Sequence, residues 1–191
     1  MNAWAAFAGW SIPARLTTVA ACGLIAGMLV NWAVYSLAYQ ASHWSPWSRR
    51  HPRAGRGDRW DLAPIWGWWR LRRRSKEPGF EPRFWVRPLI VECLCTVGFV
   101  AWYWWETVLG GLLHPHIAPG LIAANGELST WLHASCVAHL ALFVCMLSAS
   151  LIDADEWNIP DEITVPGTLL GAILLSLSPG GMLPAFFNRR M

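Results

Sequence analysis

Long apolar runs, separated by shorter polar stretches, set the pattern of this chain. Residues 16–39 contain no charged residue, and residues 130–152 contain no Asp, Glu, Lys or Arg. Residues 88–105 are apolar apart from Glu92, and a shorter apolar run covers residues 163–178. Because a helix needs about 20 apolar residues to cross a bilayer, the pattern predicts an all-α, polytopic helical membrane protein with about four transmembrane helices.

Composition supports this interpretation. The chain is 54% hydrophobic and only 14% charged, whereas a soluble domain has about 25% charged residues. The segment before the first run lacks a basic region, so we expect an uncleaved first helix rather than a removable signal peptide. We divide the chain into an N-terminal segment with the first transmembrane helix (residues 1–39), a basic loop (40–87) and a membrane region (88–191).

Charge predicts the orientation. Twelve of the 15 Lys and Arg residues lie in loop 40–87, which also holds four acids, whereas residues 106–129 contain no Lys or Arg. The positive-inside rule therefore places this loop in the cytoplasm. Its interleaved Arg and Trp residues could form a nucleic-acid surface, but beside membrane spans we expect contact with anionic lipid headgroups. Membrane lipids are thus expected partners, and nucleic acid is not.

Small and sulfur-containing residues change the picture little. The five cysteines all fall within the apolar runs, and no Cys-x-x-Cys pair occurs. We expect neither disulfides nor a structural zinc site, and no metal or cofactor. Gly23 and Gly27 form a small-xxx-small pattern, which lets a second helix approach closely but also arises by chance.

Candidate chemistry gathers in an acidic stretch that begins where the third run ends. Asp153 is the first charge after that run, and Asp155, Glu156, Asp161 and Glu162 follow within ten residues. A carboxylate at the edge of a membrane helix is costly, which makes it a site candidate. The alternatives are a solvated loop between two helices and, for Asp161, a helix N-cap.

Four blocks of sequence, taken together, resemble the type IV prepilin leader peptidases, a family of membrane aspartic peptidases. Residues 27–37 (GMLVNWAVYSL) are similar to the family's first helix, and residues 60–72 (WDLAPIWGWWRLR) to its cytoplasmic block. Residues 87–92 (RPLIVE) resemble its Arg-Tyr-Pro-Leu-Val-Glu, with the proline moved by one position. The stretch 152–167 is similar to the block around the first catalytic aspartate.

The resemblance implies a membrane aspartic endopeptidase of the bacterial inner membrane. Its substrate would be a type IV prepilin or a type II secretion pseudopilin precursor with a short basic leader peptide, cleaved at the cytoplasmic face. Asp153 would be the first catalytic aspartate, while Asp155, Glu156 and Asp161 would attract the basic leader. The pilin concerned and the oligomeric state are left open.

The chain departs from the family in two ways. The basic loop lacks the paired Cys-x-x-Cys motifs that many members carry, which puts any methyltransferase activity in doubt. The second catalytic aspartate, in a Gly-x-Gly-Asp motif, is also missing, since no acid follows Glu162. Aspartic peptidases need two carboxylates that share one proton. Asp155 would point about 200° away from Asp153 on a helix, and Pro160 argues against one continuous helix.

We therefore expect a truncated or degenerate copy of the peptidase that does not cleave prepilin alone. Two alternatives stay open: an inactive membrane scaffold that keeps the fold, and an anionic-lipid-binding membrane protein with a coincidental resemblance.

Overall fold

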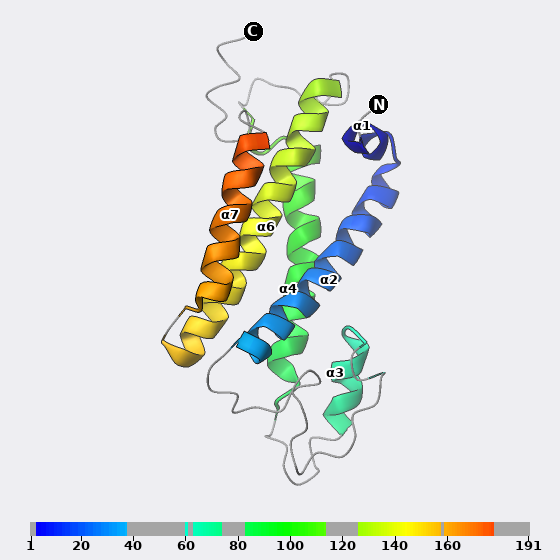
Figure 1. The fold of residues 1–191 in the computed structure, drawn as a ribbon. Coiled ribbons are helices and arrows are strands. Elements are labelled where there is room, and N and C mark those ends of the chain that lie inside the picture. Colours follow the sequence, from blue (N-terminus) through cyan, green and yellow to red (C-terminus); the bar gives the residue numbers. More distant parts are fainter. Residues whose placement is uncertain are drawn as a thin grey trace.

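Helices make up all the regular secondary structure in the part of the chain that the computed structural model describes, residues 3–37, 60, 63–73, 83–113, 126–157 and 159–177 (Figure 1). The elements are α1 (Ala3–Ala8), α2 (Ile12–Leu37), α3 (Trp66–Leu71), α4 (Val86–Tyr103), a π-helical turn η3 (Trp104–Val108) that continues α4, α6 (Gly126–Glu156) and α7 (Asp161–Leu177). The predicted all-α fold is confirmed.

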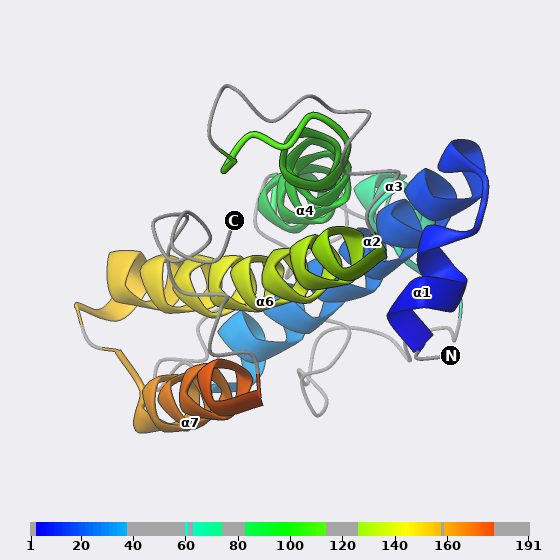
Figure 2. The same ribbon diagram turned by 90° about the horizontal axis from the view of Figure 1, so that it is seen from above.

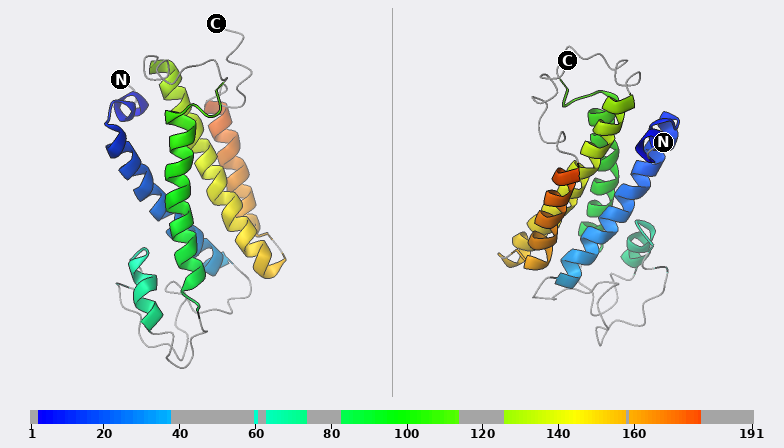
Figure 3. Two further views of the ribbon diagram at one scale, coloured as in Figure 1. Left: turned by 180° about the vertical axis from the view of Figure 1, so that it is seen from behind. Right: turned by 45° about the horizontal axis from the view of Figure 1, so that its top comes forward.

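The long helices form one bundle with two distinct ends. Helices α2, α4 and α6 cross one another along its length, and α7 runs beside α6 (Figures 1 and 3). Seen from above, α2 passes obliquely under α6, with α4 on the opposite side from α7 (Figure 2). We call the end that holds α3, the start of α4 and the end of α6 the Asp153 end. The opposite end, which holds α1, η3 and the start of α6, is the Glu106 end.

Three helices are long and apolar enough to cross a membrane: Ile12–Leu37, Val86–Val108 and Leu128–Glu156. They coincide with the three long apolar runs of the sequence, which supports the prediction of a membrane protein. Helix α7 has 17 residues and contains Pro166, so it stands at the lower limit of about 17 residues for a span. A fourth span stays a prediction.

Close approach of α2 and α4 depends on the two glycines of the small-xxx-small pattern. A Cβ atom added to Gly27 would lie 2.7 Å from the Cα of Glu92, and one added to Gly23 would lie 2.8 Å from the carbonyl oxygen of Cys95. Both obstacles are backbone atoms, which cannot rotate away. In this chain, therefore, the pattern brings two helices into contact rather than arising by chance.

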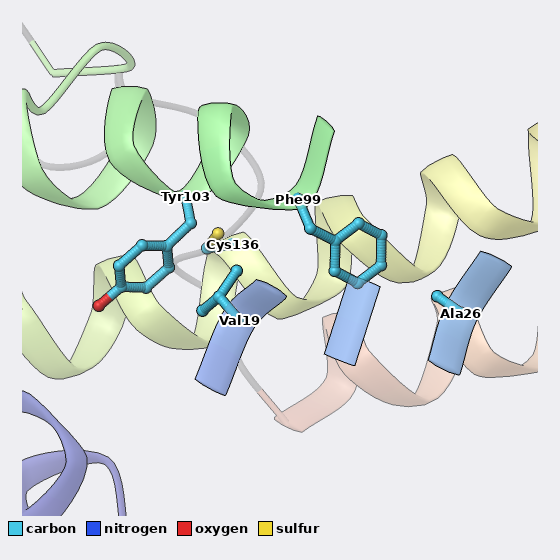
Figure 4. Packing of buried hydrophobic residues seen from close by; sticks show 5 residues of the cluster. All are labelled: Val19, Ala26, Phe99, Tyr103 and Cys136. Carbon is cyan, nitrogen blue, oxygen red and sulfur yellow. The ribbon is translucent and has the colours of Figure 1, made fainter. Parts of the chain in front are cut away.

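The middle of the bundle is apolar. One buried cluster lies between α2, α4 and α6 and contains five residues (Figure 4): Val19, Ala26, Phe99, Tyr103 and Cys136. A second cluster lies nearer the Asp153 end and consists of Val30, Val34, Val91, Cys95 and Ile152. Because Ile152 is fully buried, the end of α6 is packed firmly against α2 and α4.

Helix α6 ends before Pro160, as the sequence predicts. The chain leaves α6 after Glu156, and Trp157 adopts a positive φ of 56°. The carbonyl of Pro160 then accepts hydrogen bonds from the backbone N–H groups of Ile163 and Thr164 in the first turn of α7. The acidic stretch is thus split between the last turn of one helix and the first turn of the next.

The described part of the basic loop contains a short helix, α3, at residues 66–71. Trp68 and Leu71 are almost fully buried, and the Trp68 indole and the Ile65 backbone N–H both bond to Glu92 in α4. A six-residue helix is too short to show a period in its sequence, and it is held by these distant contacts. Most of the loop's other residues lie outside the described part.

Candidate functional site

Asp153 lies in the last turn of α6 and is exposed. The residue before it, Ile152, is completely buried against Val30, Val34 and Val91, so the backbone that carries Asp153 is held in place while its carboxyl group faces outward. Within the described residues, that carboxyl group has no hydrogen-bond or ion-pair partner. It is therefore accessible to water.

Asp155 makes a two-pronged ion pair with Arg87. The Arg87 Nη1 atom lies 2.8 and 2.7 Å from the two carboxylate oxygens of Asp155, and Nη2 donates to the carbonyl of Leu151 at 2.9 Å. Both charged side chains are about 40% exposed (41% and 38%), and such pairs add little stability. The pair nevertheless ties the start of α4 to the end of α6, and it occupies the Asp155 side chain.

The remaining acids of the stretch flank the reversal between α6 and α7. Glu156 is half-buried at the end of α6, whereas Asp161 and Glu162 are exposed. Asp161 is the first residue of α7. Its negative charge there interacts favourably with the positive N-terminal end of the helix dipole. The structure thus brings four acids to one end of the molecule: Asp153, Asp155, Glu156 and Asp161. No second acid bonds to Asp153 in the described part of the chain.

Glu92 is a buried acid whose surroundings could not be foreseen from the sequence. It is 1% exposed, and its Oε1 atom accepts hydrogen bonds from Trp68 Nε1 at 2.8 Å and from Asn31 Nδ2 at 3.3 Å. Its Oε2 atom accepts from the backbone N–H of Ile65 at 2.5 Å. Asn31 also donates to the carbonyl of Pro88 at 3.0 Å. The sequence marks Glu92 only as the one charge in an apolar run.

A second buried acid lies at the opposite end. Glu106, in the π-helical turn η3, is 0% exposed, and its carboxyl oxygens lie 2.9 and 3.0 Å from Nδ1 of His139 in α6. The Trp102 indole donates to the same group at 2.7 Å. An intramembrane carboxyl group is tolerated where such partners surround it, so this pair fixes η3 against α6.

A third polar group, formed by Arg15, Tyr103 and His133, lies at the same end as the Glu106–His139 pair. The carbonyl of Ser129 accepts from Nδ1 of His133 at 2.6 Å, which leaves Nε2 to accept from the Tyr103 hydroxyl at 3.0 Å. Arg15 Nη1 lies 3.5 Å from that hydroxyl. This set links α2, α4 and α6 near the Glu106 end.

No group of three or more His, Cys, Asp and Glu side chains is arranged to hold a metal among the described residues. Comparison with protein families, curated proteins and solved structures finds nothing that matches this chain. The site must therefore be interpreted from its own geometry and from the sequence blocks that meet around it.

Proposed function

We propose that this chain is a prepilin-peptidase-like membrane aspartic endopeptidase in which Asp153 supplies one of the two catalytic carboxylates. One observation carries the proposal: separate blocks of the resemblance meet at one place. Asn31 of the first block, Trp68 of the second and Glu92 of the third share one hydrogen-bonded group. Trp68 lies 24 positions and Asn31 lies 61 positions before Glu92 in the sequence. Their contact in the fold is a physical reason for the spacing of these separate blocks.

The fourth block contributes Asp153 at the same end of the bundle. Buried Ile152 and the Arg87–Asp155 ion pair both join the start of α4 to the end of α6. The Glu92 group therefore organises the structure that holds Asp153, and Asp153 itself stays open to water. In the proposed reaction, ionised Asp153 would take a proton from the attacking water, or, when protonated, would polarise the scissile carbonyl.

Either role needs a second carboxylate. No Asp or Glu follows Glu162 in the sequence, and Asp155 is paired with Arg87. Because no second acid bonds to Asp153 among the described residues, we infer that a second carboxylate has to be brought to Asp153 before the proposed cleavage can occur. The chain alone is expected to bind substrate without cleaving it.

The substrate class follows from the exposed charge. Asp161 and Glu162 are exposed in the first turn of α7 and would attract the basic leader of a prepilin or pseudopilin precursor, whereas Glu156 is half-buried and has a partner of its own. Asp155 contributes less to this field than the sequence indicates, because Arg87 offsets its charge. In this proposal α7 is the fourth span, loop 40–87 is cytoplasmic and the protein resides in the inner membrane. Labelling a Ser75→Cys variant from the cytoplasmic side only would agree with this topology.

The decisive experiment restores the missing carboxylate. The chain is co-expressed with a family segment that carries the Gly-x-Gly-Asp motif, and cleavage of a basic-leader prepilin is followed by gel mobility. Asp153→Asn should lower turnover by about 10²–10⁴-fold, the size of a lost general acid or base. Asp155→Asn is the matched control and should cost far less, since the amide oxygen still accepts from Arg87.

Two outcomes count against the proposal. Full activity of the Asp153→Asn variant would remove the catalytic assignment. A restored, correctly inserted complex that never cleaves would favour the inactive scaffold, which keeps the same contacts without the chemistry.

A further inference from the structure

A groove, which we call the α6–α7 groove, lies between these two helices. It has a volume of about 360 Å³, and its walls come from residues 138–149 of α6 and 163–174 of α7. The helices meet closely at Gly167, where an added Cβ would lie 3.4 Å from the sulfur of Cys145. At Gly171, one turn later, an added Cβ would meet no atom of the described chain within 4 Å. The two helices therefore touch at one level and leave open space at the next.

The walls of the α6–α7 groove are apolar and partly exposed. Leu142 and Met146 of α6 are 59% and 58% exposed, and Leu170 of α7 is 41% exposed. Other lining residues are small, which lets the backbone of another membrane helix approach closely. These small residues are Ala138, Ala141, Cys145, Ala149, Gly167 and Gly171. Because α6 is long and apolar enough to cross a membrane, the groove runs for about 16 Å along a membrane-spanning helix.

Helix α6 carries one wall of the groove directly to Asp153. Four residues, Leu142, Met146, Ala149 and Asp153, follow one another at intervals of four, three and four positions, which places them on one side of a helix. Asp153 is exposed, as Leu142 and Met146 are, so this side of α6 is apolar along the span and ends in a carboxyl group. A second helix that lies along it would bring its own end next to Asp153.

The acids of α7 lie at the same end of the groove. Ile163, which lines the groove, directly follows Asp161 and Glu162, and α7 runs beside α6 from this end (Figure 1). Asp153, Asp161 and Glu162 are exposed, and none of them is ion-paired within the described residues. Three unpaired acids attract a cation and repel an anionic lipid headgroup. The charge therefore favours an apolar occupant that ends in basic residues.

We propose that the α6–α7 groove binds the membrane-spanning helix of a partner protein, an apolar helix with Lys or Arg residues at the end that meets Asp153, Asp161 and Glu162. Side chains of that helix fill the space beside Gly171, and its basic end pairs with the three acids. The inference goes beyond the proposed function, because binding needs neither cleavage nor a second carboxylate. In the proposed function, the bound helix would present its basic end to Asp153.

Binding of a synthetic helix tests the proposal directly. The full chain is reconstituted in phosphatidylcholine nanodiscs with a fluorescent peptide of about 20 Leu and Ala residues that ends in a run of lysines. Energy transfer from the labelled chain gives the affinity, and a photoreactive residue in the middle of the peptide maps its position by mass spectrometry. We expect crosslinks to residues that line the groove. A peptide with glutamates in place of the lysines should bind more weakly.

Variants separate the contribution of shape from that of charge. Gly171→Leu fills the open space and should weaken binding about 5- to 150-fold, as overpacking does in a tight contact. Ala172→Leu adds a leucine at the next position, which is exposed and does not line the groove, and it should leave the affinity unchanged. The double variant Asp161→Asn/Glu162→Gln should bind the lysine peptide about 2- to 30-fold more weakly, the range for two exposed ion pairs. The same double variant should bind the glutamate peptide better than wild type does.

Four results would overturn the proposal. Wild-type affinity in Gly171→Leu, or crosslinks confined to α2 and α4, would show that the peptide does not bind in the groove. Equal affinity for the lysine and glutamate peptides would remove the acids from recognition. Energy transfer between two labelled copies of the chain without peptide, lost in Gly171→Leu, would assign the groove to a second copy. The assay does not depend on cleavage, so normal binding by a complex that never cleaves would contradict the proposed function and leave this inference intact.

Discussion

Replacing Glu92 by Gln should loosen α3 from the bundle. The carboxyl group faces three donors: Oε1 is 2.8 Å from Trp68 Nε1 and 3.3 Å from Asn31 Nδ2, and Oε2 is 2.5 Å from the N–H of Ile65. A glutamine has one acceptor oxygen and one NH₂ donor in place of the two oxygens. Whichever way the amide is turned, at least one donor meets another donor.

The least costly orientation leaves the Ile65 N–H unsatisfied and keeps the two bonds at the Oε1 position. An unpaired buried donor costs about 1–3 kcal/mol. Helix α3 is short, and these bonds together with the burial of Trp68 and Leu71 contribute to its attachment. The loss should therefore appear mainly as local opening of α3, while α2, α4 and α6 stay packed.

Hydrogen–deuterium exchange in nanodiscs measures that opening. In the regime where exchange follows the opening equilibrium, a loss of 1–3 kcal/mol speeds exchange of the α3 amides about 5- to 150-fold. Glu162→Gln makes the same chemical change at an exposed position and should leave α3 unchanged. If Glu92→Gln gives wild-type exchange in α3, or speeds exchange equally in α6, then Glu92 is not what holds α3.

Two more predictions concern the packing of the spans. Gly27→Ala should lower the melting temperature in detergent, because its Cβ would lie 2.7 Å from the Glu92 backbone. The expected loss of stability is about 1–3 kcal/mol. Gly171→Ala should have little effect, since no atom lies within 4 Å of the added Cβ. Replacing Glu106 and His139 by Leu, singly and together, should show a coupling energy of about 0.5–3 kcal/mol in unfolding titrations. Strictly additive losses would mean that their 2.9 Å contact contributes nothing specific.

The spans themselves could be predicted because apolar length is a local property of the sequence. Their ends could not be placed as well. The first span was predicted from residue 16, yet α2 begins at Ile12. Arg15 interrupts the apolar run, but its guanidinium group reaches the Tyr103 hydroxyl. Thr17 bonds to the carbonyl of Pro13, so this turn stays helical despite its polar residues.

The candidate site, too, could be predicted from the sequence only in part. Asp153 could be found from the sequence because it is the first charge after a long apolar run. The partner of Asp155 could not be found, because Arg87 lies 68 residues earlier and only the packing of α4 against α6 brings them together. The surroundings of Glu92 were hidden for the same reason, since its three donors come from α2, from α3 and from the residue that precedes α3.

Apolar helices in a bilayer gain little from burying more apolar surface against one another, because lipid is equally apolar. What fixes this bundle is therefore its close glycine contacts and its few buried polar groups. These groups lie at the two ends: Glu92 organises the Asp153 end, and the Glu106–His139 pair holds the other. The middle between them is filled by Phe99, Ala26 and their neighbours.

This distribution has a consequence for Asp153. The residue sits at the rim of the end where three helices and α3 are joined by directional bonds, and its own side chain takes no part in them. A carboxyl group in that position keeps a fixed backbone and an open face, which is what a second carboxylate or a substrate would need. The neighbouring acid, Asp155, gives up that freedom to hold α4 and α6 together through Arg87. In the proposed function, Asp155 would position the two helices and Asp153, two residues earlier, would carry out the chemistry.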